Sequence, residues 1–415
     1  MELNITQIKT NIGVPLWTLS SSSYSSVTLG VLIGCGARDE NWPREAGIAH
    51  ALEHMLFQGT KNFPNNMKLS SYIETIGGEI NGRTSSERTL YHARVPIGYA
   101  ERGVRVLSEQ INASIFPDEK IPVEMKNIIQ EIRRMNDDPQ GHLWHLSQRF
   151  IYNNHPLSRE VSGTEDSVAA FAKRDFLSFK ERFYNPANYV FIAVGNISQG
   201  EALKLFNRYF DGNYTRTPNT REKVRIIRRA ERQFIERREL DQLHLSIDAL
   251  IGKGRDKSSL YLEFFRDMIS SGMSSPLFQE VRDKRGLCYV VMAGLNKCSD
   301  IGRFRIYIGT DSKRYKEAIV TTLRVIEKSK KDEHLLDKIK KLKLGRLMLR
   351  YENTLDVFFA TTDDIVFLGR PRGLEEIKKE IEEVTIDDIR KSVDKYLNPD
   401  LIYITMLAPK NFVEE

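Results

Sequence analysis

The order of predicted strands and helices in the first half of the chain recurs in the second half, and this repeat restricts the fold more than any other sequence feature. Alternating apolar residues over 303–309 indicate a strand, and the helical spacing of Val104, Leu107 and Ile111 indicates a helix. In the first half, strand, helix, strand, strand and helix follow at residues 25–37, 50–57, 77–84, 89–96 and 99–111. In the second half, the same order follows at residues 243–252, 262–269, 287–294, 302–309 and 314–328. The sequence therefore predicts an internally duplicated chain of mixed helix and strand content.

The length of the chain agrees with a duplication. Its 415 residues are too many for one ordinary domain and suit two domains of roughly 200 residues, each large enough to bury its own core. Between the two halves, the segment around residues 212–230 is polar, basic and poor in apolar periodicity. We therefore predict a first domain at residues 1–215, a linker at 216–230 and a homologous second domain at 231–415.

Composition argues against several classes of protein. With 40% apolar and 28% charged residues, and no run approaching the ~18 apolar residues of a membrane span, the sequence is typical of a soluble protein without a membrane partner. The net charge of +6 is spread among 56 acidic residues, and no aromatic-basic motif is present, so we expect no nucleic-acid partner. Three cysteines cannot all pair within one chain, and the first ten residues lack a basic region followed by an apolar one, which predicts a cytoplasmic location.

The segment GIAHALEHMLFQGT, residues 47–60, places two of the eight histidines of the chain one helical turn apart. Its apolar residues follow helical spacing, so we predict an amphipathic helix over residues 44–57. Residues three and four apart are neighbours on a helix surface. His50, Glu53 and His54 are therefore expected to project toward one site, away from the apolar stripe.

Two imidazoles in this spacing predict a zinc site. Zinc favours nitrogen ligands, and a catalytic zinc commonly has three protein ligands and a water. Glu53 is then expected to be the base that takes the proton of that water. The spacing H-x-x-E-H is the reverse of H-E-x-x-H and is the inverzincin signature. Ordinary surface or core histidines are the alternative, but the low histidine content makes this spacing rare by chance.

The third zinc ligand must come from another segment, and residues 123–139 supply the best candidates. Glu124 and Glu131 lie beside a helical apolar stripe, seven residues apart and on nearly the same face. Two turns separate these carboxylates by ~10 Å along the helix axis, too far for both to bind one ion easily. One is expected to bind zinc while the other orients a ligand, and the spacing alone does not choose between them.

The chain as a whole resembles the pitrilysin family of inverzincin zinc peptidases, in particular the shorter subfamily that includes mitochondrial processing peptidase and its bacterial relatives. The resemblance covers nearly the whole chain. The matching motifs are, in order, GARDE, GIAHALEHMLFQGT, IGGEINGRTSSERTLYHARV, QEIRRMNDDP, HPLSREVSGTEDSV, FYNPANYVFIAVGNI and GMSSPLFQEVRDKRGLCYVV. The resemblance implies an α+β fold of two homologous α/β roll domains, each with an antiparallel-rich sheet packed with helices.

The resemblance also implies roles for the residues of the zinc motif and of the glutamate-bearing helix. It implies that His50, His54 and Glu131 bind one zinc ion per chain. Glu53 matches the catalytic base of the family. Glu124 matches a carboxylate that does not bind the metal itself but supports the metal ligands.

Substrate contacts follow from the same resemblance. Asn81 and Gly82 match the strand on which the family binds the substrate backbone in extended form, so a peptide would add a strand to a sheet edge. The family usually has alanine where this chain has Gly82. The second half lacks H-x-x-E-H, and its Arg282 and Tyr289 match the arginine that reaches the substrate backbone and the tyrosine that reaches the scissile carbonyl. Without the resemblance, Tyr289 would be interpreted as a strand core residue.

The sequence thus predicts a zinc-dependent metalloendopeptidase that cleaves unfolded peptides or extended presequence-like segments. The family closes two domain pairs over a chamber, and one chain supplies one pair, so we expect a homodimer or a heterodimer with a zinc-less homologue. A catalytically weak subunit that binds peptides or acts as a scaffold is the alternative, against which the intact Glu53 argues. An amidase-like zinc hydrolase is a third interpretation. His142 and His145 are competing metal candidates without a family role, and Pro276 stands where the family usually has arginine.

Overall fold

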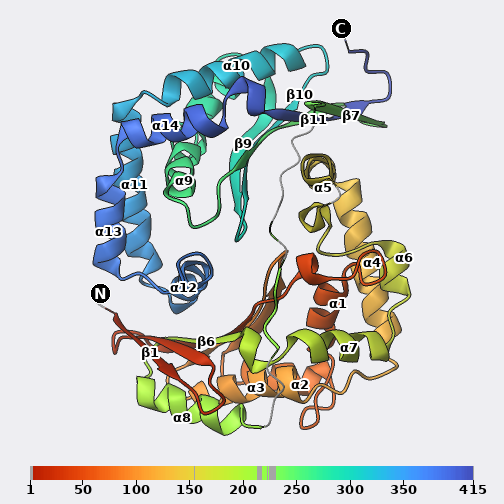
Figure 1. The fold of residues 1–415 in the computed structure, drawn as a ribbon, viewed down its shortest axis with the longest axis vertical. Helices are drawn as coiled ribbons and strands as arrows, with labels where there is room; N and C mark the ends of the chain where they lie inside the picture. Colours follow the sequence, from red (N-terminus) through yellow and green to blue (C-terminus); the bar gives the residue numbers. More distant parts are fainter. Residues whose placement is uncertain (1–2, 154, 213–216, 222, 224–229, 415) are drawn as a thin grey trace. The chain divides into compact units, whose positions relative to one another are not determined.

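The computed structural model describes residues 3–153, 155–212, 217–221, 223 and 230–414, and the chain divides into two compact units (Figure 1). Unit 1 comprises Met1–Arg134, Arg159–Glu222 and Leu347–Glu375, and unit 2 comprises Met135–Ser158, Lys223–Arg346 and Glu376–Glu415. Each half of the sequence thus contributes a segment to the unit built mainly from the other half, unlike the continuous domains predicted at 1–215 and 231–415. Much of the predicted linker at 216–230 lies outside the described residues.

Unit 1 is built on a six-stranded sheet of order β1-β2-β6-β3-β5-β4. Strands β2 and β6 run parallel, and all other neighbours run antiparallel. The strands are β1 (Asn4–Lys9), β2 (Pro15–Ser20), β3 (Ser26–Ile33), β4 (Glu79–Thr84), β5 (Thr89–Pro96) and β6 (Tyr189–Gly195). The helices within unit 1 are α1 (Ile48–Met55), α2 (Asn66–Glu74), α3 (Ala100–Asn112), α6 (Glu165–Ala169), α7 (Lys173–Phe183), α8 (Gln199–Tyr209) and α12 (Thr354–Leu368).

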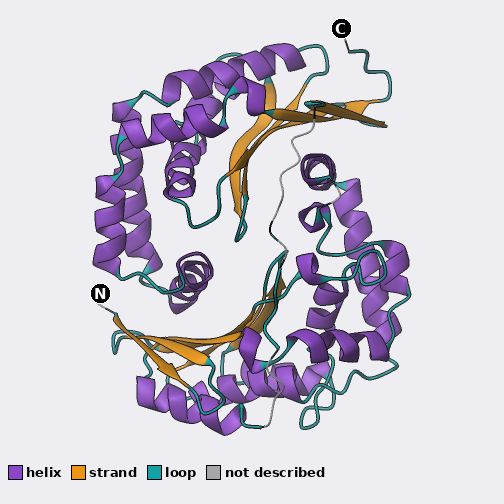
Figure 2. Cartoon of the chain, in the orientation of Figure 1, coloured by secondary structure: helices purple, strands orange, loops and turns teal. Residues whose placement is uncertain are grey.

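Strand β3 buries side chains on both of its faces, and helices accordingly cover the unit 1 sheet on both sides (Figure 2). Leu29 faces α3, where a Cβ added to Gly103 would lie only 2.7 Å from its Cδ1 atom. Gly30 faces the other way, where an added Cβ would lie 2.2 Å from Cζ of Phe358 in α12. The glycines thus allow α3 and α12 to pack closely against opposite faces of one strand.

Unit 2 is built on a five-stranded sheet of order β7-β11-β8-β10-β9, in which only β7 and β11 run parallel. The strands are β7 (Gln233–Arg238), β8 (Leu243–Ile251), β9 (Cys288–Lys297), β10 (Gly302–Thr310) and β11 (Tyr403–Pro409). The helices within unit 2 are α5 (Pro139–Tyr152), α9 (Lys257–Ser270), α10 (Tyr315–Ser329), α14 (Ile386–Tyr396) and a π-helix (Phe278–Asp283). Three further helices begin in one unit and end in the other, namely α4 (Ile121–Asp137), α11 (Glu333–Arg350) and α13 (Leu374–Glu383).

The two sheets share one topology. Strands β2-β6-β3-β5-β4 of unit 1 correspond in order to β7-β11-β8-β10-β9 of unit 2, and each set contains one parallel pair. In unit 2, α5 packs on β8 and β11. Helix α9 contacts β9, and α14 contacts β8. The predicted α+β fold with two antiparallel-rich sheets and an internal duplication is therefore confirmed. In each unit, one sheet face is covered by a helix from the opposite half of the sequence, α12 in unit 1 and α5 in unit 2.

Most predicted elements coincide with observed ones. The strands predicted at 77–84 and 89–96 are β4 and β5, and the strand predicted at 302–309 is β10. The helix predicted at 44–57 is wrong at its start, because α1 begins only at Ile48. Gly47 before it has a φ of 87°, a left-handed conformation that cannot continue a helix from the preceding residues. Among the described residues, the structure contains no helix with the length and apolar character needed to cross a membrane.

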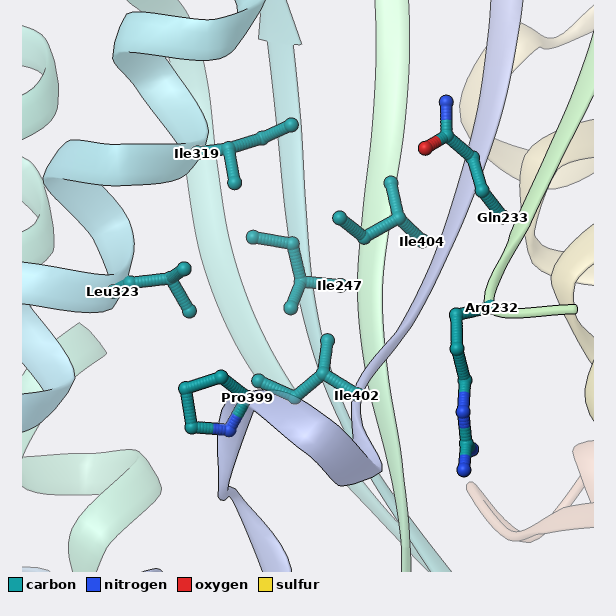
Figure 3. A pocket seen from close by; sticks show the side chains of 8 residues that line it. All are labelled: Arg232, Gln233, Ile247, Ile319, Leu323, Pro399, Ile402 and Ile404. Carbon is teal, nitrogen blue, oxygen red and sulfur yellow. The ribbon is translucent and has the colours of Figure 1, made fainter. Parts of the chain in front are cut away.

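A small, partly open cavity lies beside the sheet of unit 2 (Figure 3). Its volume is about 160 Å³, and most of its wall consists of aliphatic side chains. Figure 3 shows Ile319 and Leu323 of α10 on one side and Ile247 of β8 between them and the C-terminal segment. Arg232 also borders the cavity, and its guanidinium lies 4.6 Å from the centroid of the Tyr403 ring. The aliphatic wall identifies the cavity as a packing gap between α10 and the sheet.

The close contact between β3 and α12 predicts how a substitution at Gly30 changes the stability of unit 1. Gly30→Ala should lower the free energy of unfolding by about 1–3 kcal/mol, because the new methyl group overlaps the Phe358 ring. In a Phe358→Ala background, the same change should cost much less, because the ring is gone. Urea unfolding followed by circular dichroism measures both costs. Gly200→Ala in α8, where no atom lies within 4 Å of the added Cβ, is the control and should not destabilise. Equal costs in the two backgrounds would contradict the packing.

Candidate functional site

Helix α1 carries the H-x-x-E-H motif, and a buried carboxylate holds its first turn. Glu40 accepts hydrogen bonds from the backbone N–H groups of Gly47 at 3.0 Å and Ala49 at 3.1 Å. N–H groups at a helix start lack partners within the helix, so this contact stabilises the start of α1. Burial raises the pKa of Glu40 well above its ordinary value, and the two N–H groups oppose that shift. Sequence reasoning missed Glu40, although an acidic residue shortly before a helix was the available signal.

Both histidines of α1 and one carboxylate of α4 converge on one point. Nε2 of His50 lies 3.2 Å from Nε2 of His54 and 3.9 Å from Oε2 of Glu131. One ligand atom from each of the three residues lies within 4.8 Å of the other two. In the part of the chain that the structure describes, no other group of three or more metal-ligating side chains meets this condition. The structure thus brings together the three residues that the family resemblance assigns to zinc.

Glu124, two helical turns before Glu131, contacts His54 on the side of the ring that faces away from His50. Its Oε2 atom lies 3.4 Å from Nδ1 of His54, the ring nitrogen that faces away from His50. A carboxylate in this position orients the imidazole and increases its basicity as a ligand. No equivalent partner supports His50, whose buried Nδ1 has no hydrogen-bond partner among the described residues.

Their surroundings shift the pKa values of the two histidines in opposite directions. Burial, and after it the neighbouring His54, lowers the pKa of His50 to about 4, so this imidazole is neutral at physiological pH. Burial by itself would lower the pKa of His54, but the hydrogen bond of Glu124 and the charges of Glu53, Glu124 and Glu131 together outweigh burial and raise it. A neutral imidazole is the form that binds a metal. Two imidazole nitrogens and one carboxylate are also a ligand set of catalytic zinc sites, so the residues present fit a zinc ion.

Glu53 lies between the two histidines in the motif and is buried, with only 9% of its surface exposed. The hydroxyl of Thr84 in β4 donates a hydrogen bond of 2.5 Å to its Oε2 atom. Burial raises the pKa of Glu53, and the Thr84 hydroxyl opposes that shift. A Cβ added to Gly82 would lie 2.7 Å from Cγ and 2.8 Å from Oε1 of Glu53. The glycine in β4 therefore makes room for the position that Glu53 occupies.

Strand β4 lies at the edge of the unit 1 sheet, with a neighbour only on the β5 side. Side chains of β4 alternate in exposure, and Asn81 is exposed whereas Gly82 and Thr84 are half-buried on the Glu53 side. Oδ1 of Asn81 accepts a hydrogen bond of 2.8 Å from the N–H of Gly82. An edge strand presents unpaired backbone groups to which another strand can bind.

In unit 2, Arg282 and Tyr289 lie in contact. The Arg282 guanidinium lies 4.7 Å from the ring centroids of both Phe278 and Tyr289. Tyr289 is 72% exposed, so the interpretation of this residue as part of the strand core is wrong. β9 is an edge strand in which Tyr289 falls at a register shift opposite Gly309 and Thr310.

His142 of the competing pair has a structural contact. Its ring is 4% exposed, and Nε2 lies 2.8 Å from Oε1 of Glu236 in β7. Burial lowers the pKa of His142 although Glu236 opposes the shift. The ring thus joins α5 to the unit 2 sheet.

Comparison with known proteins identifies the family. Residues 17–165 match the sequence family described as insulinase (peptidase family M16), and residues 170–343 match the peptidase M16 inactive domain. The chain belongs to peptidase family M16. This membership confirms the family predicted from the motifs.

Relatives of similar length support the same membership. The Bacillus subtilis protein named uncharacterized zinc protease YmxG is 29% identical over 384 residues, which cover 91% of this chain and 92% of the relative. An uncharacterized zinc protease of Rickettsia felis is 27% identical over 412 residues, with 94% of each chain covered. These relatives extend over both halves of the duplicated chain.

Solved structures show the same fold. A peptidase M16 inactive domain from Pseudomonas fluorescens has a TM-score of 0.90 at 17% identity, with both chains covered completely. A protease from Helicobacter pylori has a TM-score of 0.88 at 18% identity, covering 99% of this chain and all of that one. The M16 fold therefore extends over the whole chain.

The geometry of the metal centre predicts how ligand variants rank in zinc affinity. Glu124→Gln should weaken zinc binding about 10–100-fold, because it removes a support and not a ligand. His50→Ala and Glu131→Gln should each weaken binding more than Glu124→Gln, since each removes one of three protein ligands. Competition with a chromophoric chelator measures the affinities.

Glu119→Gln is the matched control for this series, because Glu119 is an exposed glutamate close to the start of α4. Its zinc affinity should equal that of the unmodified protein. If Glu131→Gln kept the native affinity while Glu124→Gln lost it, the roles of the two carboxylates would be reversed.

Proposed function

We propose that this M16 family member is a zinc-dependent metalloendopeptidase that cleaves unfolded or extended peptides, as a processing peptidase does. The observation that carries the proposal is the convergence of His50, His54 and Glu131, with the Glu53 carboxylate on the same helix. Membership of the family and the zinc protease names of the relatives support it.

Each residue of the centre has a distinct part in this proposal. His50, His54 and Glu131 would hold the zinc ion, which supplies a Lewis acid for the water and the scissile carbonyl. Glu53 accepts the proton of the attacking water and then delivers it to the leaving amine. Its pKa, raised by burial, brings the carboxylate closer to the operating pH of a general base. The Thr84 hydroxyl donates its hydrogen bond to Oε2 of Glu53. We therefore assign proton transfer to Oε1 of Glu53, on the Gly82 side.

The substrate is bound as an additional strand at the edge of the unit 1 sheet. β4 has free backbone groups on its outer side, and Asn81 and Gly82 lie in that strand. Main-chain pairing requires that the peptide be extended, which excludes stably folded proteins from the site. The exposed Tyr289 is proposed to donate its phenolic proton to the developing oxyanion, with Arg282 holding the substrate backbone.

We further propose that the active assembly is a homodimer. The chain carries both the zinc-binding helix and the Arg282–Tyr289 pair, so two copies contain every catalytic group without a different partner. Analytical ultracentrifugation of the purified active protein tests this assembly. Activity that requires addition of a zinc-less homologue would contradict it.

Replacing the proposed base separates catalysis from metal binding. Glu53→Gln should retain one zinc per chain and lose turnover by ~10²-fold or more, because the ligands remain while the proton acceptor is removed. Zinc content is measured by atomic absorption, and cleavage of an unstructured peptide is followed by mass spectrometry. A disulfide-stabilised folded protein should remain intact with both enzymes.

The outcomes of this experiment decide between the interpretations. Full activity in Glu53→Gln would end the proposed mechanism. Absence of peptide cleavage by the zinc-loaded unmodified protein would favour the peptide-binding scaffold. Cleavage of simple amides but not of peptides would favour the amidase.

Replacing the proposed oxyanion donor tests the contribution of unit 2. Tyr289→Phe should lower kcat by ~10²–10³-fold, because it removes one preorganised hydrogen-bond donor. KM should change much less than kcat, since the interaction strengthens in the transition state. Steady-state kinetics on a fluorogenic peptide measures both. Tyr261→Phe, at a tyrosine of α9 in the same unit, is the control and should match the unmodified protein. An unchanged kcat in Tyr289→Phe would remove the tyrosine from the mechanism.

A further inference from the structure

Strand β10 places two buried arginines on the sheet face of unit 2 that α5 covers. Arg303 is 2% exposed and Arg305 is 8% exposed. Nε of Arg303 donates to Oδ1 of Asp248 in β8 at 2.6 Å, and its Nη2 donates to Oγ of Ser147 in α5 at 2.5 Å. The guanidinium of Arg305 lies 3.6 Å from the ring centroid of Trp144 in α5. These contacts hold both guanidiniums in defined orientations.

The charges in this cluster do not balance. Asp248 is paired with Arg303, and within the described residues no carboxylate lies at ion-pair distance from Arg305. Nη1 of each arginine is buried without a hydrogen-bond partner among the same residues. Burial, and after it the charge of Arg303, lowers the pKa of Arg305 to about 9, so the group remains mainly charged at neutral pH. A buried charge is costly unless a counter-charge or strong hydrogen bonds compensate it. An anion beside Arg305 would supply both.

Open space lies next to Arg305 on the same sheet face. Gly294 of β9 pairs directly with Arg305, and directly paired residues point to one face of a sheet. A Cβ added to Gly294 would meet no atom within 4 Å. β9 is the edge strand of the sheet, and Met292 and Asn296, which flank Gly294 on that face, are exposed. The space over Gly294, beside the Arg305 side chain, is therefore open toward the strand edge.

We propose that Arg305 and the space over Gly294 form a binding site for a carboxylate group, beside the positive charge of Arg303. The planar fork of guanidinium N–H groups matches a carboxylate, and Arg305, whose side chain donates no hydrogen bond to a described residue, supplies the donors. Trp144 fixes the plane of Arg305, so little side-chain entropy is lost when the ligand binds. The site uses no residue of the zinc centre, and the proposal stands whether or not the protein is a peptidase.

Binding of sodium acetate to the full-length protein tests the site, with line broadening of the acetate methyl signal as the readout. Arg305→Met removes the charge and retains the length of the side chain, while Gly294→Val fills the space and leaves both arginines in place. Each should weaken acetate binding about tenfold or more, the loss expected when charge-assisted hydrogen bonds are removed. Arg324→Met, at an exposed arginine of α10, is the matched control and should bind acetate like the unmodified protein.

Two further ligands define the chemistry of the site. Acetamide, which has the shape of acetate without its charge, should not compete. A short peptide acid should compete more strongly than acetate if the natural ligand is a peptide terminus, and its amide should lose that advantage. The proposal would be overturned if the peptide acid and its amide competed equally. It would also be overturned if neither Arg305→Met nor Gly294→Val affected acetate binding, or if no acetate bound at about 100 mM. Because Gly294→Val spares the arginines, the test remains decisive if Arg305→Met does not fold.

Discussion

The central strands of each sheet are buried on both faces and must be covered on both sides, and the arrangement of the whole chain depends on this constraint. In unit 1, Phe358 of α12 fills the space over Gly30 of β3, while Leu29 faces α3 on the other side. In unit 2, α5 supplies Ser147 and Trp144 to the buried arginines of β10. A sheet buried on both faces needs two layers of helices. Each half of the sequence supplies one helix to the sheet of the other half, so neither half completes its core alone.

The candidate metal centre depends on this frame because its residues come from three separate elements. Helix α1 supplies both histidines and Glu53, α4 supplies Glu131, and edge strand β4 supplies Thr84. Glu40 fixes the start of α1 by accepting two backbone hydrogen bonds. The candidate metal ligands, the proposed base and the sheet edge thus lie within one unit.

Gly82 lies where edge strand β4 contacts the proposed base. The family resemblance implies alanine at this position, and in this chain an added Cβ would lie 2.7 Å from Cγ of Glu53. Without that Cβ, the carboxylate can lie against β4, where Thr84 holds one of its oxygens. The departure from the family pattern is therefore a local adjustment of the space available to Glu53.

Local patterns in the sequence specified the strands, the duplication and the zinc motif, because periodicity and helical spacing act over a few neighbouring residues. They specified that His50, Glu53 and His54 share one side of a helix, but not whether Glu124 or Glu131 completes the ligand set. That choice depends on how α4 crosses α1, which places Oε2 of Glu131 3.9 Å from His50 and Oε2 of Glu124 behind His54. The exchange of α5 and α12 and the unpaired charge of Arg305 likewise arise from contacts between residues far apart in the chain. Such contacts form only when whole faces of helices and sheets are buried together, and no short pattern records which faces meet.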